Sequence, residues 1–478
     1  MKKWEIENFL QVKDNQLYID GVSAIELAKN FETPLFVFSE SRIKHNIERI
    51  KRAESVINCS LKICYAAKAN SNMAILRVVK ESGAGLEVNS GGELFKALKI
   101  GFAPEQIIFN GTSKTETELE DAINAGIYAI QSDSIYELEL TKKIAKKLKK
   151  RANVSLRLVP EIETGTLHGL QTALLTSKFG MMPEEALTVF RRWKPGDEFL
   201  RLCGIHLHIG SQTPDSKPYA EALKILFENL LTIYNETGHR LSHVNLGGGF
   251  PVNYLRDASQ VTDFSTAQIA YFSANLDTAE VLRNAWQAIK KTAESVNAAH
   301  LLEDITLLLE PGRSVISDAG VVLTTVRNKK TRPIGFHQSK IKNPKSKIET
   351  DVWLLTDAGF NILLSMETYK WYYHLISVGR AGETHETPYK LAGPLCDGGD
   401  VYFDIEGAGR LPDYRLLPEK VQPNEVLALL NAGAYSIAQM FQYNGRFLPA
   451  IVLIRENGET ELVRRRDDFE DLINNDLF

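Results

Sequence analysis

Short apolar, β-favouring runs alternate with longer stretches of helical spacing from about Pro34 to Arg313, and this alternation limits the fold more than any other feature. The candidate strands are Leu35–Phe38, Lys62–Ala66, Gly85–Val88, Ile107–Asn110, Ala129–Ser132, Val154–Leu158, Cys203–His208, His243–Leu246 and Thr306–Glu310. Helical stretches between them include 41–52, 73–80, 91–100, 114–125 and 219–237. Such alternation indicates βαβ units with parallel strands. About eight units favour a closed (β/α)8 barrel over an open sheet.

A second, β-rich domain is predicted after Arg313, where the helical spacing fades. Its candidate strands are Val321–Val326, Val352–Thr356, Glu425–Leu430, Ala450–Ile454 and Glu461–Arg465. Residues 327–350 are rich in lysine and arginine and are predicted to be a polar loop. Near the N-terminus, Val12–Ile19 has the pattern of a hairpin with a turn at Asp14 and Asn15. The predicted domains are an N-terminal segment joining the β domain (1–34), the barrel (35–313) and the C-terminal β domain (314–478).

The composition is that of a globular protein that acts on small molecules. Of the 478 residues, 44% are hydrophobic and 24% are charged, and the net charge is −4. The charges are mixed, so no polybasic surface for nucleic acid or a membrane is expected, and the basic run 142–151 is interpreted as a solvated helix face. No apolar run approaches the roughly 20 residues needed to cross a bilayer, and no signal peptide is seen, so a cytoplasmic location is predicted. The four scattered cysteines predict neither disulfides nor a metal site.

The predicted strand ends carry an unusual set of residues. In a barrel, the chemistry gathers at the C-terminal ends of the strands. The residues expected there are Lys68, His208, Gly247–Gly249, Glu310 and Arg313. Three consecutive glycines let backbone N–H groups approach an anion, and arginine has a fork suited to phosphate.

Each of these residues also has an ordinary structural interpretation. Lys68 taken alone fits a lysine with its ammonium in water, and the glycines fit a tight turn. Arg313 could pair with Glu310, and either His206 or His208 could be a structural histidine. Together, however, they supply a lysine nucleophile, a flat ring, a phosphate clamp and a carboxylate. Pyridoxal 5′-phosphate (PLP) requires these groups.

Several separated segments, in order along nearly the whole chain, resemble the fold-type III PLP-dependent decarboxylases, which include the diaminopimelate and ornithine decarboxylases. The matching segments are Tyr65–Asn70, Ser90–Leu94, Ser177–Gly180, His206–Ser211, Gly247–Pro251, Glu310–Arg313, Asp357–Gly359, Gly393–Asp400 and Asn431–Tyr435.

This resemblance implies a role for each matching residue. Lys68 would form the Schiff base with the cofactor, His208 would stack on its ring, and Glu310 would pair with the ring nitrogen. The residues that would hold the phosphate are Ser211, Gly248, Gly249, Gly312, Arg313 and Tyr435. Arg157 would lie behind these groups.

The resemblance also implies a homodimer, with the barrel of one protomer against the β domain of the other. Cys396 and Asp357 would then reach the cofactor of the partner, and a monomer would be inactive. Cys396 would donate a proton to Cα as a general acid. A buried structural cysteine is the alternative, although the flanking Gly393-Pro394 and Gly398-Gly399 favour a loop.

The expected substrate is a basic diamino acid, ornithine or lysine in either configuration, with a diamine as product. The resemblance implies that diaminopimelate decarboxylases carry Glu after the cysteine and Arg soon after the Asp-Ala-Gly run. Here Asp397 follows Cys396, and 360–367 contains no arginine, so Asp397 and Asp357 could bind a distal ammonium.

Several alternatives stay open. One is diaminopimelate decarboxylation to lysine, and another is decarboxylation of a larger amino-acid conjugate. An alanine-type racemase would place arginine near the ring nitrogen, where this chain has Glu310. A catalytically silent PLP-binding regulatory homologue would have no need of Lys68, Cys396 and Asp397 together.

Overall fold

The computed structural model describes residues 4–257, 261, 263–333 and 350–477. The chain divides into two compact units. A β-rich unit comprises Met1–Arg42, Asn253–Ser273 and Ser317–Phe478, and a barrel unit comprises Ile43–Val252 and Ala274–Ile316.

The barrel unit is built on eight parallel strands that close on themselves, as predicted. In chain order they are β5 (Ser60–Ala66), β6 (Gly85–Val88), β7 (Ile107–Phe109), β8 (Ala129–Ser132), β9 (Ala152–Arg157), β10 (Leu200–His206), β11 (His243–Asn245) and β12 (Thr306–Leu309). Each strand pairs with the next, and β12 pairs with β5 to complete the ring. The strands are almost wholly buried, which is typical of parallel strands covered on both faces.

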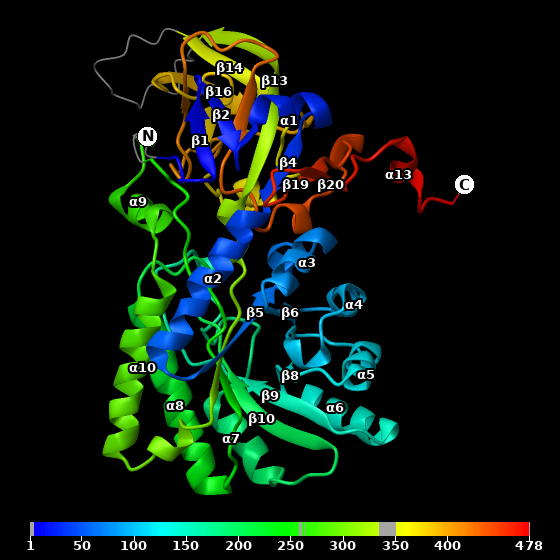
Figure 1. Ribbon diagram of the computed structural model, residues 1–478, viewed down its shortest axis with the longest axis vertical. Coiled ribbons are helices and arrows are strands. Elements are labelled where there is room, and N and C mark those ends of the chain that lie inside the picture. Colours follow the sequence, from blue (N-terminus) through cyan, green and yellow to red (C-terminus); the bar gives the residue numbers. More distant parts are fainter. Residues whose placement is uncertain (1–3, 258–260, 262, 334–349, 478) are drawn as a thin grey trace. The chain divides into compact units, whose positions relative to one another are not determined.

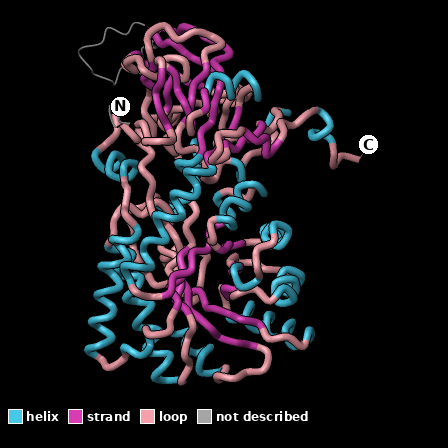
Figure 2. The backbone as a smooth tube through the Cα atoms, in the orientation of Figure 1, coloured by secondary structure: helices cyan, strands magenta, loops and turns pink. Residues whose placement is uncertain are grey.

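Helices surround this ring (Figures 1 and 2). They are α2 (Glu40–Ile57), α3 (Met73–Glu81), α4 (Gly91–Ile100), α5 (Glu116–Ala125), α6 (Ile135–Leu148), α7 (Pro183–Arg192), α8 (Lys217–Thr237), α10 (Thr278–Ser295) and the short α11 (Arg313–Ile316). Side chains of Ser90, Thr115 and Ser134 cap the N-termini of α4, α5 and α6. Left-handed Gly101 and Gly126 end α4 and α5.

The β-rich unit contains a large sheet and a small one. The small sheet is β1 (Leu10–Lys13), β2 (Gln16–Ile19) and β3 (Val22–Ser23). The large sheet has the order β17 (Arg415–Leu417), β16 (Thr387–Ala392), β14 (Thr350–Thr356), β13 (Gly320–Pro333), β4 (Leu35–Ser39), β19 (Ala450–Ile454) and β20 (Thr460–Arg464). β18 (Val426–Leu429) pairs with β13 and with β15 (Leu375–Ser377). The helices of this unit are α1 (Ala24–Phe31), α9 (Thr266–Ser273), α12 (Leu364–Thr368) and α13 (Phe469–Ile473).

One hydrophobic core joins the N-terminal hairpin to this large sheet. Leu17 of the predicted hairpin packs in the same buried cluster as Val37, Val321, Ala428 and Val452. The hairpin prediction, with its turn at Asp14 and Asn15, is confirmed. The N-terminal segment is therefore part of the β-rich unit's core.

Two sequence predictions of local structure are wrong. Leu35–Phe38 was expected among the barrel strands, but it lies in the large sheet, parallel to β19 and antiparallel to β13. A short run buried at every position fits either location, so its pattern does not choose between them. Residues 327–333 were expected in a loop but extend β13. They are mostly exposed there, which removes the apolar alternation that marks a strand. The rest of that predicted loop, 334–349, lies outside the described residues.

No helix among the described residues is both long and apolar enough to cross a membrane.

Candidate active site

The C-terminal ends of the barrel strands bring together the residues predicted for the site. Lys68 lies in a short 3-10 turn (Ala67–Ala69) directly after β5. Glu310 follows β12, Gly247–Gly249 follow β11 closely, and His208 lies two residues beyond the end of β10. Arg157 is the last residue of β9. Because all eight strands are parallel, these residues share one face of the barrel.

Glu310 is the most constrained of these side chains. It is buried, and its Oε1 accepts hydrogen bonds from Nδ2 of Asn245 at 2.7 Å and of Asn110 at 2.9 Å. Burial and the nearby Glu87 carboxylate raise its pKa to about 7, against a lowering effect of Lys68. A cationic partner next to Glu310 would strongly stabilise the ionised form of this carboxylate.

The residues around Glu310 were missed by the sequence analysis. Asn110 also donates to Glu87 at 2.8 Å, and His206 Nε2 lies 3.6 Å from Glu310 Oε2. Their signal was positional, since Asn110, Asn245 and His206 all lie within predicted strands. Propensity does not distinguish an inward-facing amide from an ordinary strand-end polar residue.

His208 is held by the glycine segment. Its Nδ1 accepts a hydrogen bond from the Gly248 backbone N–H at 3.1 Å, and its carbonyl accepts one from Thr172 Oγ1 at 2.8 Å. Burial, followed by Lys68 and Arg157, lowers its pKa well below the usual value. His208 is therefore neutral near pH 7. The Gly248 contact fixes the orientation of its ring.

The glycines leave no room for side chains. A Cβ on Gly248 would lie 2.3 Å from the Glu310 carbonyl oxygen, and one on Gly249 would lie 2.5 Å from the Gly210 carbonyl oxygen. Gly249 also has a φ of +98°, which side-chain-bearing residues rarely adopt. The close packing brings bare backbone to the barrel mouth, as an anion cradle requires.

Arg313 and Ser211 extend this cradle. Arg313 is buried at the start of α11, and its Nε donates to Ser211 Oγ at 3.1 Å. Gly312 precedes it, and a Cβ there would lie 3.0 Å from the Ala69 Cβ, beside Lys68. The barrel unit therefore brings Ser211, Gly312 and Arg313 toward the same face as the glycine segment.

Arg157 has partners of its own. Its guanidinium lies 4.1 Å from the centre of the Phe179 ring, and its Nε is 3.9 Å from Asp133 Oδ1. Burial lowers its pKa from the usual value. These contacts fix Arg157 as a positive charge behind the site, next to the predicted segment Ser177–Gly180.

Cys396 and Asp397 lie on an exposed loop of the β-rich unit. The exposure of Cys396 excludes the buried structural cysteine considered above. Its backbone N–H donates to Asn444 Oδ1 at 2.7 Å, and Asp397 Oδ2 accepts from the Tyr443 hydroxyl at 3.2 Å. One segment, 442–448, thus holds both residues.

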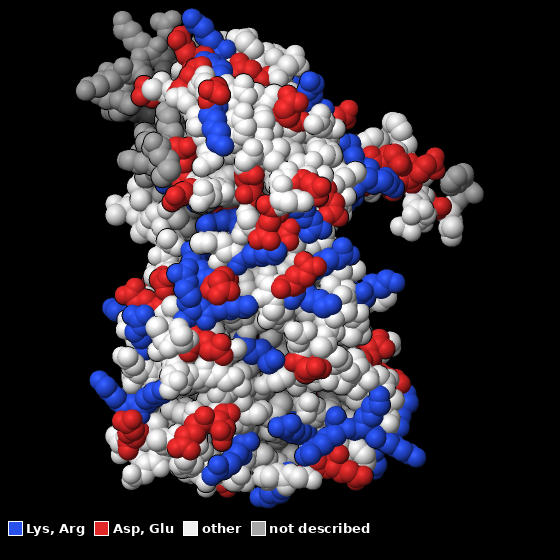
Figure 3. All heavy atoms as spheres, viewed as in Figure 1, with Lys and Arg blue, Asp and Glu red and all other residues white. Residues whose placement is uncertain are grey.

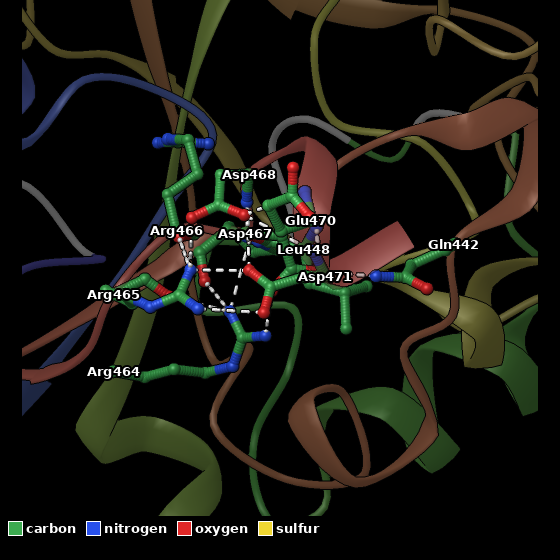
Figure 4. Close-up of polar contacts among 10 residues, drawn as sticks. Gln442, Leu448, Arg464, Arg465, Arg466, Asp467, Asp468, Glu470 and Asp471 are labelled. Carbon is green, nitrogen blue, oxygen red and sulfur yellow. Dashed lines mark hydrogen bonds and ion pairs between the residues drawn. The ribbon is translucent and has the colours of Figure 1, made fainter. Parts of the chain in front are cut away.

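A network of charged residues anchors that segment (Figure 4). Asp467 Oδ2 accepts from Gln442 Nε2 at 2.7 Å and from the Leu448 backbone N–H at 3.2 Å, so it binds both ends of the segment. Arg464 donates to the other oxygen of Asp467. The position of Cys396 therefore depends on residues that follow β20.

Asp357 and Tyr435 also lie in the β-rich unit. The Asp357 carboxylate accepts from the hydroxyls of Thr33 and Thr324, at 2.7 Å each, and from Arg327 Nε at 2.9 Å. Tyr435 has a φ of +59°, an uncommon value for tyrosine. For Tyr435, binding of the cofactor phosphate stays a prediction. For Asp357, contact with the cofactor of a partner and with the substrate also stays a prediction.

The barrel mouth fits PLP by its donor set. A buried carboxylate would accept a hydrogen bond from the protonated ring nitrogen, bare glycine backbone with Arg313 would receive a phosphate, and Lys68, directly after the neighbouring strand β5, would supply the amine. The charge of Lys68 lowers the pKa of both Glu310 and His208.

Comparisons with known proteins agree with this geometry. Residues 42–317 match the family model described as the pyridoxal-binding domain of pyridoxal-dependent decarboxylases. Diaminopimelate decarboxylase of Aquifex aeolicus is 33% identical over 473 residues, which cover 98% of this chain and 97% of that protein. The Methanocaldococcus jannaschii diaminopimelate decarboxylase is 34% identical, over 98% and 96%. The crystal structure of the latter enzyme with L-lysine has a TM-score of 0.81 and covers 98% of each chain at 32% identity.

Proposed function

The chain belongs to the pyridoxal-dependent decarboxylase family, and from this premise we propose that it decarboxylates diaminopimelate to lysine. Family membership makes it a PLP-dependent carboxy-lyase that acts on an amino acid. The choice of amino acid is the proposal.

Full-length similarity carries this choice. Relatives that are 33% and 34% identical over 98% of the chain are named diaminopimelate decarboxylases. The matched region covers nearly the whole chain and so spans both units. It favours diaminopimelate over the ornithine or lysine expected from the sequence.

Ornithine or lysine remains the second candidate because of two specific positions. Asp397 follows Cys396, and the stretch 360–367, which includes Ser365, has no arginine. However, other arginines are close to the Cys396 loop. A hollow of about 640 Å³ in the β-rich unit is lined by Arg327, Arg446 and Arg466 together with Pro394 and Leu395.

Arg446 is the arginine most closely tied to that loop. Its Nη2 donates to the Pro394 carbonyl at 2.9 Å, two residues before Cys396. A guanidinium here could bind a distal carboxylate through its remaining N–H groups. The absence of arginine from 360–367 therefore does not exclude diaminopimelate.

Residues of the barrel mouth would hold and orient the reacting groups. PLP, when bound, supplies an electron sink for the electron pair left by departing carbon dioxide. Asn110 and Asn245 hold Glu310 so that its carboxylate can accept a hydrogen bond from the protonated ring nitrogen. His208, neutral and fixed by Gly248, offers a flat ring without adding charge. Lys68 would be the covalent attachment point.

Cys396 would act as the general acid that protonates Cα after carbon dioxide leaves. Its exposure in the isolated chain suits a thiol that works in the site of a second protomer. We accordingly propose a homodimer in which each β-rich unit contributes Cys396 to the partner. Asp397, oriented by Tyr443, would then be available to a distal ammonium.

A substrate screen tests the function. Carbon dioxide release is measured from meso-diaminopimelate, L- and D-lysine, L- and D-ornithine and arginine. We expect diaminopimelate to give the largest kcat/KM and lysine as product. Turnover of ornithine or lysine without diaminopimelate would contradict the proposal and favour the second candidate.

An absorbance measurement tests the cofactor site separately. The purified protein with PLP is expected to be yellow, and Lys68→Ala should abolish the visible band. Lys62→Ala is the matched control, because Lys62 lies on β5, the strand that leads to Lys68, but its Nζ donates to the Glu105 carbonyl. A visible band that survives in Lys68→Ala would reject Lys68 as the attachment point.

A further inference from the structure

A basic hollow lies at the opposite end of the barrel from the active site. It measures about 180 Å³, and four cations line it: Arg151, Lys194, Arg201 and Arg240. Arg151 immediately precedes β9, Arg201 is the second residue of β10, and Arg240 lies just before β11. These are the N-terminal ends of the strands, so the hollow is separate from the site described above.

Carboxylates near this hollow already have other partners. Asp197, the acidic residue in its lining, binds Lys142 at 2.5 Å, and its other oxygen accepts from the Phe199 and Leu200 backbone N–H groups at 3.0 Å. Across the nearby helices, Glu139 pairs with Arg192 and Glu236 pairs with Arg191, both at 2.6 Å. None of these three acids forms an ion pair with the four lining cations.

The four cations have only weak contacts of their own. Arg151 Nε donates to the Leu200 carbonyl at 3.4 Å, and the Arg240 guanidinium lies 5.5 Å from the centre of the Tyr234 ring. Within the described part of the chain, no Asp or Glu forms an ion pair with any of the four. Such an excess of positive charge in one hollow stands out in a chain with a net charge of −4.

The walls of the hollow are ordered. His239 is buried, and its Nδ1 is 2.8 Å from Thr237 Oγ1. Trp193 is buried as well, under the guanidinium of Arg192, which lies 4.4 Å from its ring centre. Long cationic side chains over the buried Leu200 and Leu202 can converge on one anion.

The hollow lies beside a part of the surface that is rich in Lys and Arg. Lys and Arg side chains gather over α6 and the adjacent end of the barrel in Figure 3. A second hollow of about 640 Å³ shares the segment 193–197, and its lining includes Trp193 and the ion pairs Lys142–Asp197 and Arg192–Glu139. Like charges in a cleft raise the local concentration of anions.

We propose that the hollow lined by Arg151, Lys194, Arg201 and Arg240 binds a phosphoryl group, either of inorganic phosphate and pyrophosphate or of a phosphorylated metabolite. Guanidinium groups bind phosphate oxygens in pairs, and the hollow has the volume for one or two phosphoryl groups but not for a larger ligand as a whole. The adjacent hollow, with its tryptophan, would receive the organic part of a phosphorylated metabolite.

Calorimetric titration of the PLP-loaded enzyme tests this proposal. PLP already fills the phosphate cradle at the barrel mouth, so the titrated anions cannot bind there and disturb the measurement. Phosphate, pyrophosphate and ATP are titrated separately, without divalent metal and at matched ionic strength. We expect saturable binding at one site per chain, and tighter binding of ATP than of pyrophosphate would identify the metabolite as the ligand source. Heat changes no larger than those with sodium chloride would overturn the proposal.

A charge-matched pair of variants separates a site from general attraction. Arg201→Gln combined with Arg240→Gln should weaken pyrophosphate binding at least about tenfold. Lys143→Gln combined with Lys224→Gln changes the net charge equally at exposed positions outside the hollow and should leave binding unchanged. Equal weakening in both double variants, or in neither, would reject the site. If the double variant at Arg201 and Arg240 loses its PLP absorbance, Lys194→Gln is tested in its place. This variant should also weaken pyrophosphate binding.

Discussion

The ionisation of Glu310 links burial at the barrel mouth to stability. Its pKa is raised from 4.5 to about 7, mainly by burial and by Glu87. A carboxyl with a higher pKa in the folded state binds its proton more tightly there. The Glu310 carboxyl therefore contributes its full stabilisation of the folded state below about pH 4.5. This stabilisation is lost as the pH rises through about 7. The shift corresponds to roughly 3 kcal/mol.

The cofactor-free protein should therefore lose stability relative to Glu310→Gln as the pH rises from 5 to 8. Glutamine keeps an acceptor for Asn110 and Asn245 but has no proton to lose. The measurement is urea unfolding of both proteins at several pH values. Parallel pH dependences for the two proteins would show that Glu310 does not carry this linkage.

Cys396→Ala should lower kcat by about 10²- to 10⁴-fold, the usual contribution of a general acid. The PLP absorbance should be unchanged, because Cys396 belongs to the β-rich unit and is not among the residues of the barrel mouth. Steady-state kinetics and a visible spectrum check both expectations. Cys59→Ala, which removes a thiol that donates to the Ile305 carbonyl, is the control and should retain full activity. Equal loss in the two variants would argue against a chemical role.

At the level of residues, the sequence predicted single groups better than their surroundings. Lys68, Glu310 and Arg313 were identifiable because barrel chemistry gathers at strand ends. Asn110, Asn245 and Glu87 were not, since what matters about them is which way a side chain points inside the closed barrel. That direction depends on strand tilt and register, which residue type alone does not encode.

At the level of elements, the tight contact between the Gly248 backbone and the end of β12 should control cofactor binding. Gly248→Ala would place a Cβ 2.3 Å from the Glu310 carbonyl oxygen, so the backbone must shift. We expect at least about tenfold weaker PLP affinity, measured by fluorescence titration of the cofactor-free protein. Gly92→Ala is the control, because its nearest neighbour, Ser90 Oγ, would be 3.8 Å away. Unchanged PLP affinity in Gly248→Ala would show that the segment can relax.

In both units, elements that are long enough to show their own period were predictable from the sequence. Helix 91–100 and strand Ala450–Ile454 were found with their observed limits. The prediction for Leu35–Phe38 was wrong because a wholly apolar run fits a barrel and a sheet core equally well. Its location is decided by pairing with β13 and β19, which lie far along the chain.

At the level of the whole molecule, the two units carry complementary parts of the proposed chemistry. Lys68 and Glu310 lie in the barrel unit, whereas Cys396 and Asp397 lie in the β-rich unit. Cys396 is exposed and its backbone is held by Asn444, which suits a thiol that acts in the site of a second protomer. This division is the reason to expect active sites shared between two protomers, which the sequence suggested only by resemblance.

Mixing two inactive variants tests the shared site. Lys68→Ala and Cys396→Ala should each be inactive alone. If sites combine Lys68 of one protomer with Cys396 of the other, each mixed dimer has one intact site and one doubly defective site. An equal mixture that exchanges subunits contains about half mixed dimers, so about a quarter of the wild-type activity should return. Sedimentation should show a species of twice 53.6 kDa. Exchange without recovered activity would mean that both residues act within a single chain.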